Sequence, residues 1–102
     1  MAKKTIMLVC AAGMSTSLLV SKMQKAAAED HEDVTIFATA ASDAQSKIES
    51  EHPDILMLGP QVNYLISSFK ERETIPVEVI NMQDYGMMNG RKVLEQALKD
   101  MT

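Results

Sequence analysis

The chain has 102 residues, of which 46% are apolar, and a formal net charge of −4. This length suits one folded unit with a buried core, and we expect residues 1–102 to form a single domain. The acidic balance argues against a general nucleic-acid or lipid-surface binder. No apolar run approaches the roughly 20 residues of a membrane span, and the N-terminus lacks the pattern of a signal peptide. A single cysteine forms no internal disulfide and suits a reducing cytoplasm.

The first predicted strand, residues 4–9, leads directly into the only cysteine, Cys10. Residues 11–17 then make a turn of small and hydroxyl side chains, and the apolar spacing predicts an amphipathic helix over residues 15–29, with Leu18 on its buried face. A strand, a glycine-containing loop and a helix N-terminus together form an anion site, because backbone N–H groups and the helix dipole point at the ligand. The same groups favour a thiolate. We therefore hypothesise that Cys10 accepts a phosphoryl group and passes it on.

The middle of the chain predicts a second strand over residues 34–38. Ser42 and Gln45 have the spacing of a capping box, which predicts a short helix that His52-Pro53 ends. Residues 54–58 predict the third strand, which is the most apolar and is expected at the centre of the sheet.

The last part of the chain predicts two more helices and one more strand. Pro60 suits the first turn of a helix, and residues 77–80 predict a short fourth strand at an edge of the sheet, since Pro76 precedes it. Residues 81–90 are predicted to be a polar loop. Helical spacing marks the two helices at Val62, Leu65, Ile66 and Phe69, and at Leu94, Ala97, Leu98 and Met101.

This alternation predicts an α/β fold, a three-layer α-β-α sandwich around a four-stranded parallel sheet of order 2-1-3-4. In such sheets ligands bind beyond the carboxyl ends of the strands. Cys10, Thr39, residues 59–61 and residues 81–85 are all expected at that edge.

Other loop chemistries fit less well. A nucleotide-binding P-loop needs a lysine, and none lies between Cys10 and Ser21. A redox motif needs a second cysteine, and a receiver domain needs an aspartate where the third strand ends, at Leu58-Gly59. A tyrosine phosphatase is the nearest rival, but Thr16 stands where its arginine would be, and Asp84 is the only candidate for its acid. No residues have the spacing of a metal site. The remaining alternative is that Cys10 is a small apolar residue of the buried core.

Residues 9–19, Val-Cys-Ala-Ala-Gly-Met-Ser-Thr-Ser-Leu-Leu, resemble the phosphocysteine signature of enzyme IIB of the bacterial sugar phosphotransferase system (PTS), lactose/cellobiose family. Residues 58–62 resemble the second hallmark of that family, and residues 76–80 with Tyr85-Gly86 fit its later part. The resemblance covers essentially the whole chain and is nearest to the cellobiose/β-glucoside (diacetylchitobiose) type.

The resemblance implies a cytoplasmic phosphocarrier that takes a phosphoryl group from a phosphohistidine of enzyme IIA and gives it to a disaccharide held by the membrane permease, enzyme IIC. It implies no cofactor, no metal, no nucleic acid and no insertion into the membrane. Cys10 would be the nucleophile, and Gln61 and Tyr85, by position, would line the crevice. The phosphate loop would consist of Ala11, Ala12, Gly13, Met14, Ser15, Thr16 and Ser17. A small phosphatase and a domain that reports phosphorylation state remain as alternatives.

Overall fold

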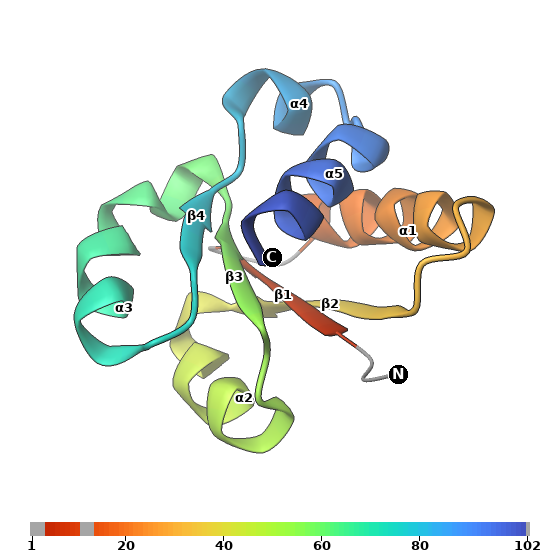
Figure 1. Cartoon of the computed structure of the whole chain (residues 1–102). Helices are drawn as coiled ribbons and strands as arrows, with labels where there is room; N and C mark the ends of the chain where they lie inside the picture. The colour runs from red at the N-terminus through yellow and green to blue at the C-terminus, as the bar shows by residue number, and fades with distance from the viewer. Residues whose placement is uncertain (1–3, 11–13, 102) are drawn as a thin grey trace.

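The computed structural model describes residues 4–10 and 14–101, except for the side chains of residues 14–16. Strands and helices alternate along the chain (Figure 1). In the described part, no helix is long and apolar enough to cross a bilayer. The elements are β1 Lys4–Cys10, α1 Met14–Glu29, β2 Val34–Ala40, the 3-10 turn η1 Ala41–Asp43, α2 Ala44–Glu51, β3 Ile55–Leu58, the 3-10 segment η2 Pro60–Leu65, α3 Ile66–Arg72, β4 Val77–Val79, α4 Met82–Gly86 and α5 Gly90–Met101.

The four strands form one parallel sheet in the order β2-β1-β3-β4, which confirms the predicted order. Cys10 pairs in register with Ala40 of β2, and Val9 pairs with Leu58 of β3. β3 is buried at every position, as expected for an inner strand covered on both faces. β4 has three residues and forms an edge of the sheet, as predicted.

Helices cover both faces of the sheet, so the predicted three-layer sandwich is confirmed (Figure 1). Successive side chains of a strand point to opposite faces. Ile6 and Leu8 of β1 therefore pack in the core beneath α1 and α5, whereas Met7 and Val9 pack in the core beneath α2 and α3. α4 lies beyond the ends of the strands, at the top of Figure 1.

The capping box predicted at Ser42 and Gln45 is wrong. The chain makes the 3-10 turn η1 there, α2 begins one residue later than the box requires, and the side chain of its N-cap residue, Asp43, makes no capping hydrogen bond. Gln45 Nε2 instead donates to Glu49 Oε2 one turn along the helix, at 3.3 Å. The predicted end of the helix is confirmed, because His52 adopts a left-handed conformation (φ 49°) and closes it.

The polar loop predicted over residues 81–90 contains a short helix, α4, so this prediction is wrong over Met82–Gly86. Asn81 Oδ1 accepts hydrogen bonds from the backbone N–H groups of Gln83 and Asp84, at 2.9 and 3.1 Å. This cap satisfies two of the free N–H groups at the start of the helix. Five residues are too few to show helical periodicity, so the capping asparagine was the only usable signal.

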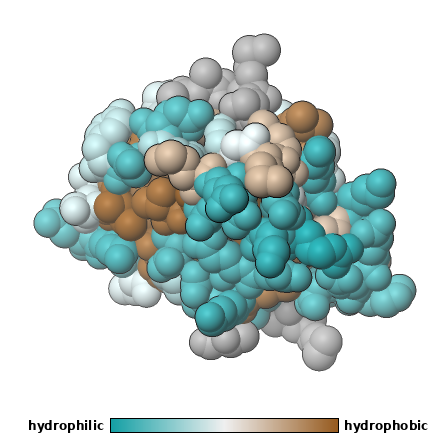
Figure 2. Space-filling view, turned by 90° about the horizontal axis from the view of Figure 1, so that it is seen from above, coloured by the Kyte–Doolittle hydropathy of each residue, from teal (hydrophilic) through white to brown (hydrophobic). Residues whose placement is uncertain are grey.

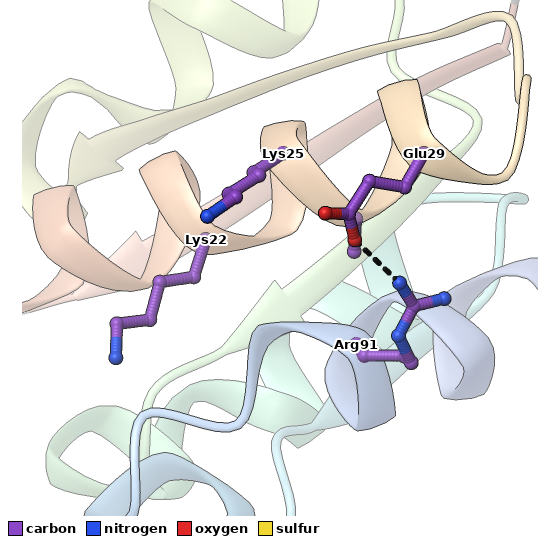
Figure 3. A pocket seen from close by; sticks show the side chains of 5 residues that line it. Lys22, Lys25, Glu29 and Arg91 are labelled. Atoms are coloured by element: carbon purple, nitrogen blue, oxygen red, sulfur yellow. Dashed lines mark hydrogen bonds and ion pairs between the residues drawn. The ribbon is translucent and has the colours of Figure 1, made fainter.

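The start of α5 packs tightly against α1. A Cβ on Gly90 would lie 2.6 Å from the carbonyl carbon of Lys22, so only glycine allows the two backbones to approach this closely. Arg91 then forms an ion pair with Glu29, at 2.7 Å (Figure 3), and another with Asp30. A hollow of about 290 Å³ between these helices is lined by Lys22, Lys25, Ala26, Glu29 and Arg91.

Candidate functional site

Cys10 is the last residue of β1, at the carboxyl edge of the sheet. Its side chain is only 3% exposed, and the thiol donates to the carbonyl oxygen of Thr39, with an Sγ–O distance of 3.7 Å. A buried cysteine alone is equally typical of a core residue. The position of Cys10 relative to β3 is what favours a functional role.

The strand order reverses between β1 and β3, and this is the point at which a parallel α/β sheet opens a ligand crevice. Gly59 follows β3 directly, and its N–H donates to the carbonyl oxygen of Val9 at 2.8 Å. A Cβ on Gly59 would lie 3.8 Å from the Cβ of Cys10. Cys10 and Gly59 therefore lie next to each other where the fold is expected to bind its ligand.

At the same edge of the sheet, a residue that follows β3 is hydrogen-bonded to a residue that follows β4. Gln61, on η2, donates from Nε2 to the hydroxyl oxygen of Tyr85 on α4, at 3.2 Å. Gln61 Oε1 lies 3.0 Å from the position that a Cβ on Gly59 would occupy. Tyr85 is buried, with 8% of its surface exposed. The structure thus brings Gln61 and Tyr85 together, although 24 residues separate them in the sequence.

Residues 11–13 of the predicted phosphate loop, and the side chains of residues 14–16, lie outside the described residues. α1 begins at Met14, four residues after Cys10, and its first turn contains no acidic residue. The partial positive charge of the helix N-terminus is therefore not offset by a carboxylate of that turn. Ser17 is exposed in the first turn of α1.

Both arginines of the chain lie on other parts of the molecule. The guanidinium of Arg72 stacks over the ring of Phe69 on α3, at 4.9 Å, and Arg91 pairs with carboxylates at the end of α1. Neither arginine thus takes the place of the central cation of a tyrosine phosphatase, which weakens that alternative. In the described part of the chain, no three residues form a group that could hold a metal ion.

Large apolar side chains are exposed on the elements that begin at the carboxyl ends of the strands. Leu18, predicted on the buried face of its helix, is 53% exposed near the start of α1. Sequence reasoning did not single out Tyr64, Met82 or Met87, and the two methionines lie in the stretch predicted to be a polar loop. Figure 2 shows this end of the molecule, with brown and tan surface between teal patches. The exposed side chains are Leu18, Tyr64, Met82 and Met87.

The fold and the placement of Cys10 define a small parallel α/β protein with a cysteine at the carboxyl edge of its sheet. Residues 5–96 match the family model for the lactose/cellobiose-specific IIB subunit of the PTS. The chain belongs to this family, as its sequence motifs predicted.

Characterised relatives match nearly the whole chain. It is 53% identical over 103 aligned positions to the galactose-specific EIIB component of the PTS from Lactococcus lactis subsp. cremoris, and 52% identical over 103 to the cellobiose-specific EIIB component from Lactococcus lactis subsp. lactis. Each of these alignments covers 95% of both chains. It is 42% identical over 101 positions to the oligo-beta-mannoside-specific EIIB component from Bacillus subtilis, with 96% of both chains covered.

Two solved structures share the fold. The cellobiose-specific IIB component from Borrelia burgdorferi is 36% identical, with a TM-score of 0.81 over 98% of this chain and 93% of the other. The lactose-specific IIB domain from Streptococcus pneumoniae is 20% identical and shows the fold alone, with a TM-score of 0.84 over 99% of this chain and 100% of the other.

Proposed function

We propose that this chain is a cytoplasmic phosphocarrier for sugar uptake, in which Cys10 carries the phosphoryl group. The observation that carries the proposal is the placement of Cys10 beside Gly59, where the strand order reverses, in a chain of the IIB family. The names of the relatives include galactose, cellobiose and oligo-beta-mannoside specificity. We propose a disaccharide of the cellobiose/β-glucoside class as the acceptor, because the motifs of this chain are nearest to that type.

The proposed reaction has two in-line displacements at phosphorus. Cys10 first releases its proton to solvent. The thiolate then attacks the phosphorus of a phosphohistidine on enzyme IIA whose other ring nitrogen carries a proton, so that the ring can leave as neutral imidazole. The S–P bond forms while the N–P bond breaks, and imidazole leaves. In the second step a sugar hydroxyl attacks the same phosphorus and loses its proton, the O–P bond forms and the thiolate is regenerated. The hydrogen bond from the thiol to Thr39 must break before the first step.

The phosphoryl group would be held by residues 11–17 and by the start of α1. Backbone N–H groups and the helix dipole stabilise the negative charge that spreads over the phosphoryl oxygens during transfer. A site without an arginine would hold the group less tightly than a phosphatase does, which suits a carrier that gives the group away. Displacement between two nucleophiles needs no cofactor.

The exposed apolar residues around this edge suit contact with the two partners, enzyme IIA and the permease, enzyme IIC. Leu18 belongs to the helix that begins after Cys10. Met82 begins α4, the helix that carries Tyr85, and Met87 follows the last residue of that helix. Large exposed side chains of this kind mark interaction surfaces when they gather at one site. Both partners would have to reach the same sulfur, so we expect them to bind in turn.

Intact mass spectrometry tests the proposal. The protein is incubated with phosphoenolpyruvate, the general phosphotransferase proteins and a matching enzyme IIA. We expect the mass to rise by one phosphoryl group, only when enzyme IIA is present, and expect no rise for Cys10→Ala. The matched control is Ser50→Ala, an exposed change on α2. Steady release of phosphate from an aryl phosphate, without any gain in mass, would contradict the proposal and support a phosphatase.

A further inference from the structure

The Gln61 carboxamide lies between Gly59 and Tyr85. Its oxygen packs over Gly59, 3.0 Å from the position that a Cβ would take, and the same position lies 3.8 Å from the Cβ of Cys10. Its nitrogen donates to the Tyr85 hydroxyl at 3.2 Å. Gln61 is an exposed residue overall, but its end group therefore lies over Gly59, the residue next to Cys10.

This contact has a direction. An amide nitrogen only donates, so the hydroxyl oxygen of Tyr85 acts as the acceptor in it. A phenol has a single proton, and in this arrangement the proton points to a partner other than Gln61. An anion near the hydroxyl is attracted by that proton and repelled by the oxygen lone pairs. The orientation of the hydroxyl therefore decides whether it stabilises or destabilises negative charge.

We propose that Gln61 is a positioning residue for phosphoryl transfer at Cys10 and that it acts through Tyr85. The inference rests on the proposed function, because it needs an anionic group on the sulfur. By donating to the Tyr85 hydroxyl, Gln61 fixes the position of that hydroxyl at the edge of the sheet that carries Cys10. Gly59 supports this arrangement, because a side chain there would displace the Gln61 carboxamide.

A double-mutant cycle tests the pathway through Tyr85. The rate at which enzyme IIA phosphorylates Cys10 is measured by quenched-flow mass spectrometry for Gln61→Ala, Tyr85→Phe and the double variant. Loss of one hydrogen bond that acts in the transition state slows transfer by roughly three- to tenfold. We expect Gln61→Ala to be slower by this factor, and the double variant to be no slower than Tyr85→Phe. Gln45→Ala, at an exposed glutamine on α2, is the matched control and keeps the wild-type rate.

A second measurement does not depend on activity. Gln61→Glu replaces the donor by a carboxylate, which accepts the hydroxyl proton of Tyr85 and adds a negative charge beside it. Ultraviolet titration in a Tyr64→Phe background reports Tyr85 alone, because the chain has two tyrosines. We expect Tyr85 to ionise at higher pH in Gln61→Glu than in Gln61→Ala. We also expect Gln61→Glu to transfer more slowly than Gln61→Ala.

The outcomes separate this inference from the proposed function. If the wild-type protein is phosphorylated and Gln61→Ala is phosphorylated at the same rate, the positioning role is overturned and the proposed function stands. Additive losses in the cycle also overturn the positioning role, since they mean that Gln61 acts independently of Tyr85. If Tyr85 ionises at the same pH in Gln61→Glu as in Gln61→Ala, the contact between Gln61 and Tyr85 is itself overturned. Absence of wild-type phosphorylation overturns the proposed function, and the positioning role with it.

Discussion

Gly59 and Cys10 lie side by side at the ends of β3 and β1, so close that a Cβ on Gly59 would be 3.8 Å from that of Cys10. The backbone of Gly59 is extended (φ −63°), a conformation that any residue adopts. Glycine is therefore favoured here by the space around it, because the Gln61 oxygen lies 3.0 Å from the position of a Cβ. A small side chain at this position would disturb the site more than the fold.

Gly59→Ala is expected to lower the free energy of unfolding by at most about 1 kcal/mol, because the flexible Gln61 side chain yields to the new methyl group. The rate of Cys10 phosphorylation is expected to fall roughly three- to tenfold, because the carboxamide moves away from Tyr85. Urea unfolding and the mass assay measure the two effects. A large loss of stability with a normal rate would show that Gly59 serves the fold alone.

Gly90→Ala is expected to lower the free energy of unfolding by about 1–3 kcal/mol or more, because its methyl group would overlap the backbone of Lys22 on α1. Backbone atoms of a packed helix cannot yield as a flexible side chain does. Urea unfolding measures the change. Gly86→Ala is the matched control, since nothing lies within 4 Å of its Cβ position and stability should stay nearly constant. Equal effects of the two variants would contradict the close packing.

Asn81→Ala is expected to lower the free energy of unfolding by about 1 kcal/mol, because it removes the oxygen that caps α4. Asn81→Asp keeps an accepting oxygen and should retain most of the stability. Because α4 carries Tyr85, the alanine variant should also slow phosphorylation of Cys10 more than the aspartate variant does. Thermal unfolding and the mass assay test this, and identical behaviour of the two variants would exclude a capping role.

Glu78, on the edge strand β4, predicts a pH dependence of stability. Burial, followed by the nearby carboxylate of Asp100, raises the pKa of Glu78 above its ordinary value of 4.5, although Lys70 partly opposes this. A carboxyl whose pKa is higher in the folded than in the unfolded protein binds its proton better in the folded state. Its contribution to stability is therefore full below pH 4.5 and is lost as pH rises through the raised value.

Glu78→Gln is accordingly expected to gain stability relative to wild type as the pH rises from about 4 to 7. Urea unfolding at several pH values gives the difference between the two proteins. Glu95→Gln, the same change of charge at an exposed position of α5, controls for net charge. A difference between Glu78→Gln and wild type that stays constant with pH would contradict the prediction.

Much of the fold could be predicted from the sequence, because the apolar spacing of strands and helices is a local property. The alternation of elements determined a parallel sheet with helices on both faces, and the strand order followed the prediction. The motif around Cys10 determined the family, since a cysteine, a glycine and hydroxyls in fixed order are readable without a structure.

Prediction from short sequence patterns failed where the same few residues can adopt more than one local structure. Ser42 and Gln45 match a capping box, but a 3-10 turn precedes α2 and Gln45 bonds along the helix. The short helix α4 was missed because five residues show no periodicity. Leu18 fits the apolar face of α1, but it is exposed near the start of the helix.

The sequence by itself determined the class of fold, the family and the position of Cys10 at the end of the first strand. Only the tertiary structure decided that Gln61 donates to Tyr85, that Gly59 leaves room for this contact, and that Gly90 lets α5 pack on α1. The reason is physical. Hydrophobic periodicity is written in neighbouring residues, whereas these contacts join residues far apart in the chain, and their geometry exists only once the strands and helices have packed.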